Sequence, residues 1–235
     1  MSIESNIEEV RARIRAACER CGRDPEDVTL IAVTKLHEAE EMNEAIDCGI
    51  TDIAENKVQE VLRKYDDVKP ATWHLIGHLQ TNKVRQIITK VALIHSVDSL
   101  HLAREIDKRA AQNDLVMDIL IQVNTAHEDS KFGVDPQEVD GLIEEIAETC
   151  PHVRVRGLMC IAPFEAEPEE TRPFFRAAKE IFDRWQAKGP SDRIDFRWLS
   201  MGMTNDFEVA IEEGSNMVRV GTAIFGSRDY RREEL

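Results

Sequence analysis

Short apolar segments alternate with segments of helical periodicity along almost the whole chain, and this alternation limits the folds that the chain can adopt. Eight apolar segments are typical of buried strands, and they cover residues 29–35, 52–56, 73–77, 92–97, 117–124, 155–161, 197–202 and 217–221. Apolar residues at helical spacing mark the intervening segments 38–49, 82–91, 99–113, 136–150 and 170–189. Because alternating strands and helices form parallel βαβ units, and eight such units fit 235 residues, the sequence predicts an α/β fold of the (β/α)8 TIM-barrel type.

An open, doubly wound sheet is the alternative arrangement of the same alternation. Its usual sign is a glycine-rich turn after the first strand, and the turn TKLHEAEE contains no glycine. No linker or low-complexity tract divides the chain, so one domain over 1–235 is expected. It would consist of an N-terminal helix over 1–24, the barrel over 28–221, and a C-terminal helix with a charged tail over 222–235. Three glycines are placed to end helices: Gly49, Gly189 and Gly214.

The charge of the chain limits its partners. A formal net charge of -15 repels phosphate-rich surfaces, so neither nucleic acid nor an anionic membrane is expected, although a local basic pocket could bind a small anion. No apolar run approaches the roughly 20 residues that cross a bilayer, and the N-terminal segment is amphipathic and unlike a signal peptide. The five cysteines are Cys18, Cys21, Cys48, Cys150 and Cys160. Their odd number and wide scatter predict reduced thiols in a cytoplasmic protein, without a metal site.

Lys35 ends the first predicted strand, where a barrel places its functional residues. A charge at the end of a buried strand costs free energy unless it is solvated, paired or used as a neutral amine. The side chain could extend from the barrel mouth into solvent. It could also be a partly desolvated amine that attacks an aldehyde to form a Schiff base. Position alone does not decide between the two.

Two glycine-bearing turns, SMGMT over 200–204 and GTAIFG over 221–226, follow the last two predicted strands. In barrels this is the usual place for a phosphate, which backbone N–H groups at a helix N-terminus can bind. Glycine permits close approach of the backbone, and Ser200, Thr204 and Thr222 can donate hydroxyl hydrogen bonds. Ordinary turns are the plain alternative, but two such turns on neighbouring strands favour a phosphate site.

Arg219 lies within the last predicted strand, between Val218 and Val220. Side chains alternate along a strand, so Arg219 faces away from both valines. If it points into the barrel, this enclosed cation requires a partner. A carboxylate and a heteroaromatic nitrogen of a ligand are the two options.

A lysine for an aldehyde, a site for a phosphate and a cation for a ring nitrogen together describe pyridoxal 5'-phosphate (PLP). The sequence also resembles the pyridoxal phosphate homeostasis proteins over nearly its full length. The matching segments are AVTK, AENKVQE, WHLIGHLQTNK, IQVNTAHEDSKFG, GLMCIAP, LSMGMTNDFEVAI and VRVGTAIFG. This resemblance implies the barrel of alanine racemase without that enzyme's second domain.

The resemblance also implies roles for individual residues. Lys35 would form the aldimine with PLP, Arg219 would lie at the pyridine nitrogen, and Asn56 would lie near the ring. The expected cofactor-binding residues are Lys35, Asn56, Ser200, Met201, Gly202, Thr204, Arg219, Gly221 and Thr222.

Other positions carry weaker expectations. The family usually has glycine where this chain has Ala54, so the rim beside Asn56 is expected to sit slightly differently. Lys131 matches a family lysine and is either a second cation at the barrel mouth or a solvated loop residue. His74 and His78 are expected to be hydrogen-bonded barrel histidines, with a role in positioning the cofactor as the alternative.

Binding PLP does not by itself specify catalysis. Arginine keeps its proton, so a ring nitrogen beside it stays unprotonated and the ring is a weak electron sink. Racemisation also needs a second base, and the two tyrosines, Tyr65 and Tyr230, lie in a predicted outer helix and in the tail. The sequence therefore predicts a non-catalytic protein that buffers PLP or delivers it to PLP-dependent apoenzymes. An amino-acid racemase and a Schiff-base aldolase acting on a sugar phosphate are the alternatives.

Overall fold

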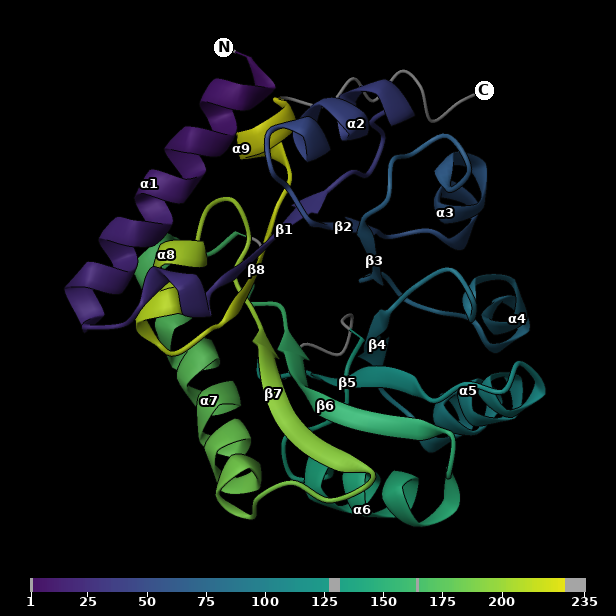
Figure 1. Cartoon of the computed structure of the whole chain (residues 1–235). Helices are drawn as coiled ribbons and strands as arrows, with labels where there is room; N and C mark the ends of the chain where they lie inside the picture. Colours follow the sequence, from purple (N-terminus) through teal and green to yellow (C-terminus); the bar gives the residue numbers. More distant parts are fainter. Residues whose placement is uncertain (1, 127–131, 164, 227–235) are drawn as a thin grey trace.

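The fold is a closed barrel of eight parallel strands that pair in chain order (Figure 1). A computed structural model describes residues 2–126, 132–163 and 165–226 of the chain. The strands are β1 Thr29–Val33, β2 Asp52–Glu55, β3 Thr72–Leu75, β4 Leu93–Val97, β5 Met117–Val123, β6 Val153–Cys160, β7 Ile194–Ser200 and β8 Met217–Val220. β1 pairs with both β2 and β8, which closes the sheet. The predicted (β/α)8 barrel is confirmed, and the open doubly wound sheet is wrong.

Helices surround the strands on the outside of the barrel (Figure 1). They are α1 Ile3–Cys21, α2 Ala39–Asp47, α3 Val58–Lys64, α4 Val84–Ile87, α5 Leu100–Gln112, α6 Val139–Thr149, α7 Arg172–Ala187, α8 Phe207–Glu212 and α9 Thr222–Phe225. The helix predicted over 82–91 is shorter than expected, because a 3-10 turn at Thr81–Lys83 precedes α4. The glycines predicted to end helices do so with left-handed backbone: φ is +84° at Gly49, +75° at Gly189 and +102° at Gly214.

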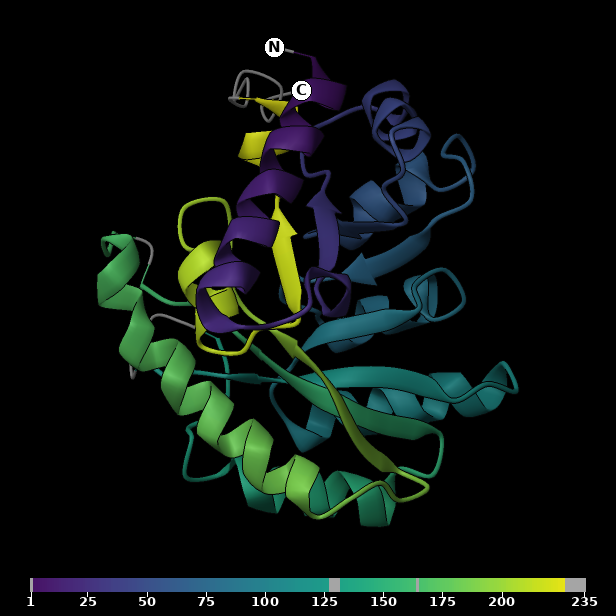
Figure 2. The same cartoon turned by 60° about the vertical axis from the view of Figure 1, so that its left-hand side comes forward.

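The extra N-terminal helix, α1, packs outside the ring beside α2, α8 and α9 (Figure 2). Ser2 caps its first turn by accepting a hydrogen bond from the backbone N–H of Ser5, and Gly22 ends it with φ +69°. Its buried residues fall on one face: Ile7, Val10, Ile14, Ala17 and Cys18. Helical spacing of these apolar residues therefore attaches α1 to the barrel wall.

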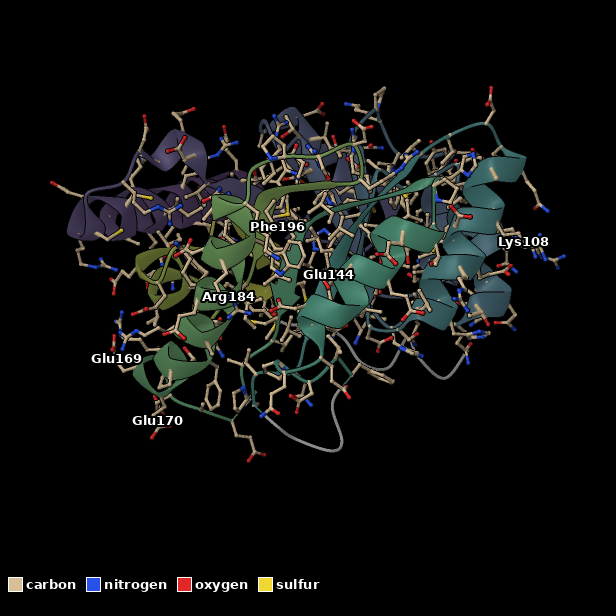
Figure 3. The ribbon with its side chains drawn as sticks, turned by 90° about the horizontal axis from the view of Figure 1, so that it is seen from below. Lys108, Glu144, Glu169, Glu170, Arg184 and Phe196 are labelled. Atoms are coloured by element: carbon tan, nitrogen blue, oxygen red, sulfur yellow. The ribbon has the colours of Figure 1, made fainter. Side chains whose placement is uncertain are left out.

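Side-chain alternation divides the apolar core into two parts. A small cluster fills the inside of the barrel: Ile31, Ala54, Leu93, Leu120, Met159 and Met217. The larger cluster lies between the strands and the helices. There Phe196 of β7 packs against Phe182 and Trp185 of α7, with ring centroids 5.5 and 5.7 Å apart. Figure 3 labels Phe196 with Arg184 of α7 and Glu144 of α6, which lie on the helices covering this side of the sheet.

The cysteines are unpaired thiols, as predicted. Within 2–126, 132–163 and 165–226, no cluster of three His, Cys, Asp or Glu side chains could hold a metal ion. None of the helices in these ranges is long and apolar enough to cross a membrane. Lys131 and Tyr230 lie outside the described residues.

Candidate cofactor-binding site

Lys35 lies in the turn that leaves β1, two residues beyond the end of the strand. Its side chain is half-buried, and in the described part of the chain it has no hydrogen-bond or ion-pair partner. The next residue, Leu36, has φ +67°, a left-handed conformation that is uncommon for a residue other than glycine. The turn therefore presents, at the C-terminal end of the barrel, an amine that no group of the described residues engages.

A buried polar network fixes the backbone just before Lys35. Lys64 of α3 is only 1% exposed, and its Nζ donates to the carbonyl of Thr34 at 3.1 Å and to Glu55 Oε1 at 2.8 Å. The hydroxyl of Thr34 donates to the same carboxylate oxygen at 2.6 Å. Burial raises the pKa of Glu55, and the charge of Lys64 acts against that rise. The sequence did not reveal this network, because lysine is almost never fully buried.

Arg219 points into the barrel, opposite to its neighbouring valines, as the alternation predicts. Its guanidinium donates to Ser200 Oγ at 2.6 Å and to the carbonyl oxygen of Cys160 at 3.0 Å. Both acceptors are neutral, and among the described residues no carboxylate forms an ion pair with this group. Burial lowers the pKa of the guanidinium. A buried cation without a direct anionic partner is available to a ligand.

The turn after β7 packs tightly against α8. Gly202 has φ +92°, and a Cβ there would lie 2.6 Å from the Cβ of Ala210, so only glycine fits. Its carbonyl accepts a hydrogen bond from the backbone N–H of Arg219 at 3.1 Å. Asp206 stabilises the turn by accepting from the backbone N–H of Met203 at 2.6 Å. These contacts hold the two predicted phosphate turns, after β7 and after β8, next to each other.

The side chains of these two turns divide between the interior and the surface. Ser200 points into the barrel towards Arg219, and Met201 is buried in the core, where its backbone N–H donates to the carbonyl oxygen of Met217 at 3.2 Å. Thr204 is partly exposed, Gly221 is the N-cap of α9, and Thr222 is exposed at the first position of that helix. The sequence predicts a phosphate contact for the Ser200 hydroxyl, whereas the structure engages it inside the barrel.

The ends of β2 and β3 meet beside Lys35. A Cβ at Gly77 would lie 2.2 Å from the carbonyl oxygen of Asn56, so the two turns touch through their backbones. Asn56 is partly exposed there. Ala54 packs in the inner cluster, in register with Val33 and His74, so the barrel accommodates its methyl group.

The two histidines named above have different environments. His74 is buried, with Nδ1 3.0 Å from His95 Nε2 and Nε2 2.9 Å from Asp52 Oδ1. It is a hydrogen-bonded barrel histidine, as predicted. His78 is exposed and stacks on Phe132, with ring centroids 3.9 Å apart, so the prediction of a barrel histidine is wrong for this residue.

The predicted site residues lie on neighbouring strand ends, because Ile31 of β1 is in register with both Asp52 of β2 and Arg219 of β8. This end of the barrel combines an unengaged amine, two glycine turns and a buried cation with neutral acceptors. An aldehyde, a phosphate and an unprotonated ring nitrogen are the groups that these features can bind. The residues present therefore fit PLP.

Comparison with known proteins relates this barrel to PLP-binding proteins. The model of the alanine racemase N-terminal domain family matches residues 5–229. The pyridoxal phosphate homeostasis protein of Aquifex aeolicus is 44% identical, over 98% of this chain and 100% of that protein. The protein of the same name from Escherichia coli K12 is 39% identical, over 98% of this chain and 99% of that protein.

Solved structures agree with these relatives. PipY of Synechococcus elongatus, solved with PLP bound, matches with a TM-score of 0.82 at 33% identity, over 96% of this chain and 100% of PipY. The alanine racemase of Clostridium difficile matches with a TM-score of 0.76 at 15% identity, over 96% of this chain and 56% of that enzyme, which shows a shared fold. The chain therefore belongs to the alanine racemase N-terminal domain family and, within it, to the pyridoxal phosphate homeostasis proteins.

Proposed function

We propose that this protein binds PLP as a Schiff base on Lys35 and serves in PLP homeostasis, by buffering or delivering the cofactor. The observation that carries the proposal is that, among the described residues, the Lys35 amine has no polar partner and the buried Arg219 donates only to neutral acceptors. Two relatives bear the name pyridoxal phosphate homeostasis protein, and PipY has been solved with PLP. Free PLP is a reactive aldehyde, so reversible binding would keep a usable and harmless pool.

Each residue has one task in this proposal. The Lys35 amine would attack the aldehyde carbon, so that a C=N bond replaces the C=O bond and the carbonyl oxygen leaves as water. Backbone N–H groups of Gly202, Thr204, Gly221 and Thr222 would bind the phosphate, with hydroxyls from Thr204 and Thr222. Arg219 would donate a hydrogen bond to the ring nitrogen, and Asn56 would contact the side of the ring.

The direct test is a visible absorption spectrum of the purified protein, followed by borohydride reduction and peptide mapping. We expect an absorption band at longer wavelength than that of the protein alone, and reduction should fix the label on Lys35. A label on a different lysine would refute the assignment.

Loss of the Arg219 guanidinium should weaken PLP binding while the phosphate and lysine contacts remain. Hydrogen bonds to charged groups contribute about 1.5–3 kcal/mol, so Arg219→Met should lower the affinity about tenfold to a hundredfold. Met is chosen because it fills the site without placing a carboxylate there. The measurement is absorbance titration with PLP, after circular dichroism has verified folding.

Arg197→Met is the matched control, because Arg197 lies on β7 with a side chain that is 61% exposed. We expect the control to bind PLP like the unmodified protein. Equal affinity of Arg219→Met and the control would place the ring away from Arg219.

A racemase would need a second base above the ring. Tyr65 ends α3 on the outside of the barrel, where its ring lies against Trp73 with centroids 5.6 Å apart and under Lys90. This position supports a non-catalytic role. Incubation with single enantiomers of candidate amino acids should cause no loss of optical activity, and racemisation at enzymatic rates would favour the alternative.

A Schiff-base aldolase would turn over a sugar phosphate without bound PLP. The protein freed of PLP should therefore show no aldol cleavage. Turnover in that state would favour the aldolase over the carrier.

We also infer that PLP-dependent apoenzymes receive the cofactor from this protein, in the cytoplasm. The unpaired thiols support a reducing compartment. Mixing the loaded protein with an apoenzyme in the presence of a phosphatase that destroys free PLP tests direct delivery. Activation of the apoenzyme under these conditions supports it, and complete loss of activation contradicts it.

A further inference from the structure

A continuous line of hydrogen-bonded side chains runs through the barrel interior from Arg219. Arg219 Nη1 lies 2.6 Å from Ser200 Oγ, and Ser200 Oγ lies 3.0 Å from His95 Nδ1. The Nε2 atom of His95 lies 3.0 Å from His74 Nδ1, and His74 Nε2 lies 2.9 Å from Asp52 Oδ1. These five residues come from β8, β7, β4, β3 and β2, which all face the same interior (Figure 1).

Only the last member of this line reaches solvent. Ser200 and His95 are fully buried, and His74 and Arg219 are each 3% exposed. The Asp52 side chain is 18% exposed, at the first position of β2. The line therefore joins the buried cation of the cofactor site to a carboxylate that touches none of the predicted site residues.

When both histidines are neutral, the two ends of the line fix the direction of its hydrogen bonds. A guanidinium only donates and a carboxylate only accepts. Asp52 therefore accepts from the N–H at His74 Nε2, and a neutral His74 accepts at Nδ1 from His95 Nε2. A neutral His95 then accepts at Nδ1 from the Ser200 hydroxyl, whose oxygen accepts from Arg219. Arg219, Ser200, His95 and His74 each donate once in the direction of Asp52.

The charges along the line agree with this direction. Burial lowers the pKa of His95 well below its usual value, and the nearby charge of Arg219 lowers it further, so this ring is neutral. Burial acts to raise the pKa of Asp52, but hydrogen bonds from His74 and Thr51 outweigh it, so the pKa lies below its usual value. The carboxylate at the end of the line is therefore ionised.

We propose that Asp52, His74 and His95 are positioning residues for Arg219, which act by turning the Ser200 hydroxyl proton towards His95 and its lone pairs towards the guanidinium. Hydrogen bonds in series polarise one another, so the distant carboxylate strengthens the acceptor that the buried cation needs. Without this orientation the hydroxyl proton could point at Arg219 and repel it. The expected effect on PLP affinity rests on the proposed PLP site. The direction of the hydrogen bonds does not depend on the cofactor.

The tautomers of the two histidines test the direction in the PLP-free protein. Long-range 1H–15N NMR of protein labelled at histidine should show His74 and His95 protonated at Nε2 and unprotonated at Nδ1. The signals are assigned by comparison with His95→Asn and His74→Asn. Protonation of His95 at Nδ1 would overturn the proposal whether or not PLP binds.

Asp52→Asn tests whether the carboxylate orients the Ser200 hydroxyl through the two histidines. An amide can donate to His74 Nε2 and reverse every hydrogen bond up to Ser200. We expect Asp52→Asn to protonate His95 at Nδ1 and to lower PLP affinity about twofold to tenfold, the effect of one neutral hydrogen bond. Unchanged tautomers or unchanged affinity would contradict the proposal.

Two comparisons separate positioning from a general structural effect. Asp195→Asn alters another partly buried carboxylate, which pairs with Arg156 outside the line, and it should leave the His95 tautomer and PLP affinity unchanged. Ser200→Ala removes the link, so Asp52→Asn should have no further effect on PLP affinity in that background. Ser200→Thr keeps the hydroxyl and should restore the response to Asp52→Asn. Additive losses in the double variant would overturn the proposal.

Discussion

Lys35→Ala should abolish the covalent adduct with PLP completely and leave the barrel folded. The side chain is half-buried at the rim and has no polar partner in the described chain, so its removal leaves no unsatisfied group. Borohydride reduction followed by intact mass should show one added PLP in the unmodified protein and none in the variant. Circular dichroism and thermal unfolding should be nearly unchanged.

Weak PLP binding should persist in Lys35→Ala, because the phosphate turns and Arg219 do not depend on this lysine. Equilibrium dialysis measures this residual binding. Lys57→Ala is the matched control, since Lys57 is an exposed lysine on the neighbouring turn after β2 and should keep the adduct. Persistence of a reducible adduct in Lys35→Ala would show that another lysine carries the cofactor.

The barrel itself could be predicted from local patterns. Each strand has an apolar run of a length that fits a buried parallel strand, and each run is followed by a polar segment. Seven of the eight predicted strand segments extended one or two residues past the observed ends, as at Lys35 and Asn56. Alternation also predicted correctly that Arg219 faces away from its neighbouring valines, since the strand period is 2.

The interior contacts could not be predicted, because they depend on which strand ends meet. His95 lies in β4, a strand of five buried residues, and the local sequence does not indicate the partner of its ring. Its contacts with His74 and Ser200 arise from strand register and from the closure of the barrel. Ser200 also could not be placed from the sequence. Its glycine-bearing turn predicts a phosphate contact, but its side chain points into the barrel.

Lys64 was missed for a different reason. Local sequence places it near the end of an exposed-looking helix, and its burial is balanced by ion pairs at 2.8 Å with the buried Glu55 and with the partly exposed Glu60. Removing one partner of a buried ion pair leaves an uncompensated charge and costs about 3–5 kcal/mol. Lys64→Met should therefore lower the free energy of unfolding by about this amount near pH 8, as measured by urea denaturation.

The pH dependence of the unfolding free energy of Lys64→Met tests whether the ionised Glu55 causes the loss of stability. Burial raises the pKa of Glu55 in the folded protein, and loss of the lysine removes the charge that opposes this rise. A carboxyl with a raised folded pKa stabilises the protein fully below its unfolded pKa, and this stability is lost as the pH rises. The deficit of Lys64→Met should therefore shrink as the pH falls towards the usual glutamate range.

Two further variants make the Lys64 prediction specific. Glu55→Gln combined with Lys64→Met should recover a large part of the lost stability, because no charge is then buried without a partner. Lys69→Met removes a lysine whose side chain is 49% exposed in its pair with Asp47, and exposed pairs contribute about 0–1 kcal/mol. Because Lys64 also donates to the carbonyl that precedes Lys35, Lys64→Met should slow formation of the PLP adduct, whereas Lys69→Met should not. Equal stability of the two single variants at pH 8 would show that the buried pair contributes no more than an exposed one.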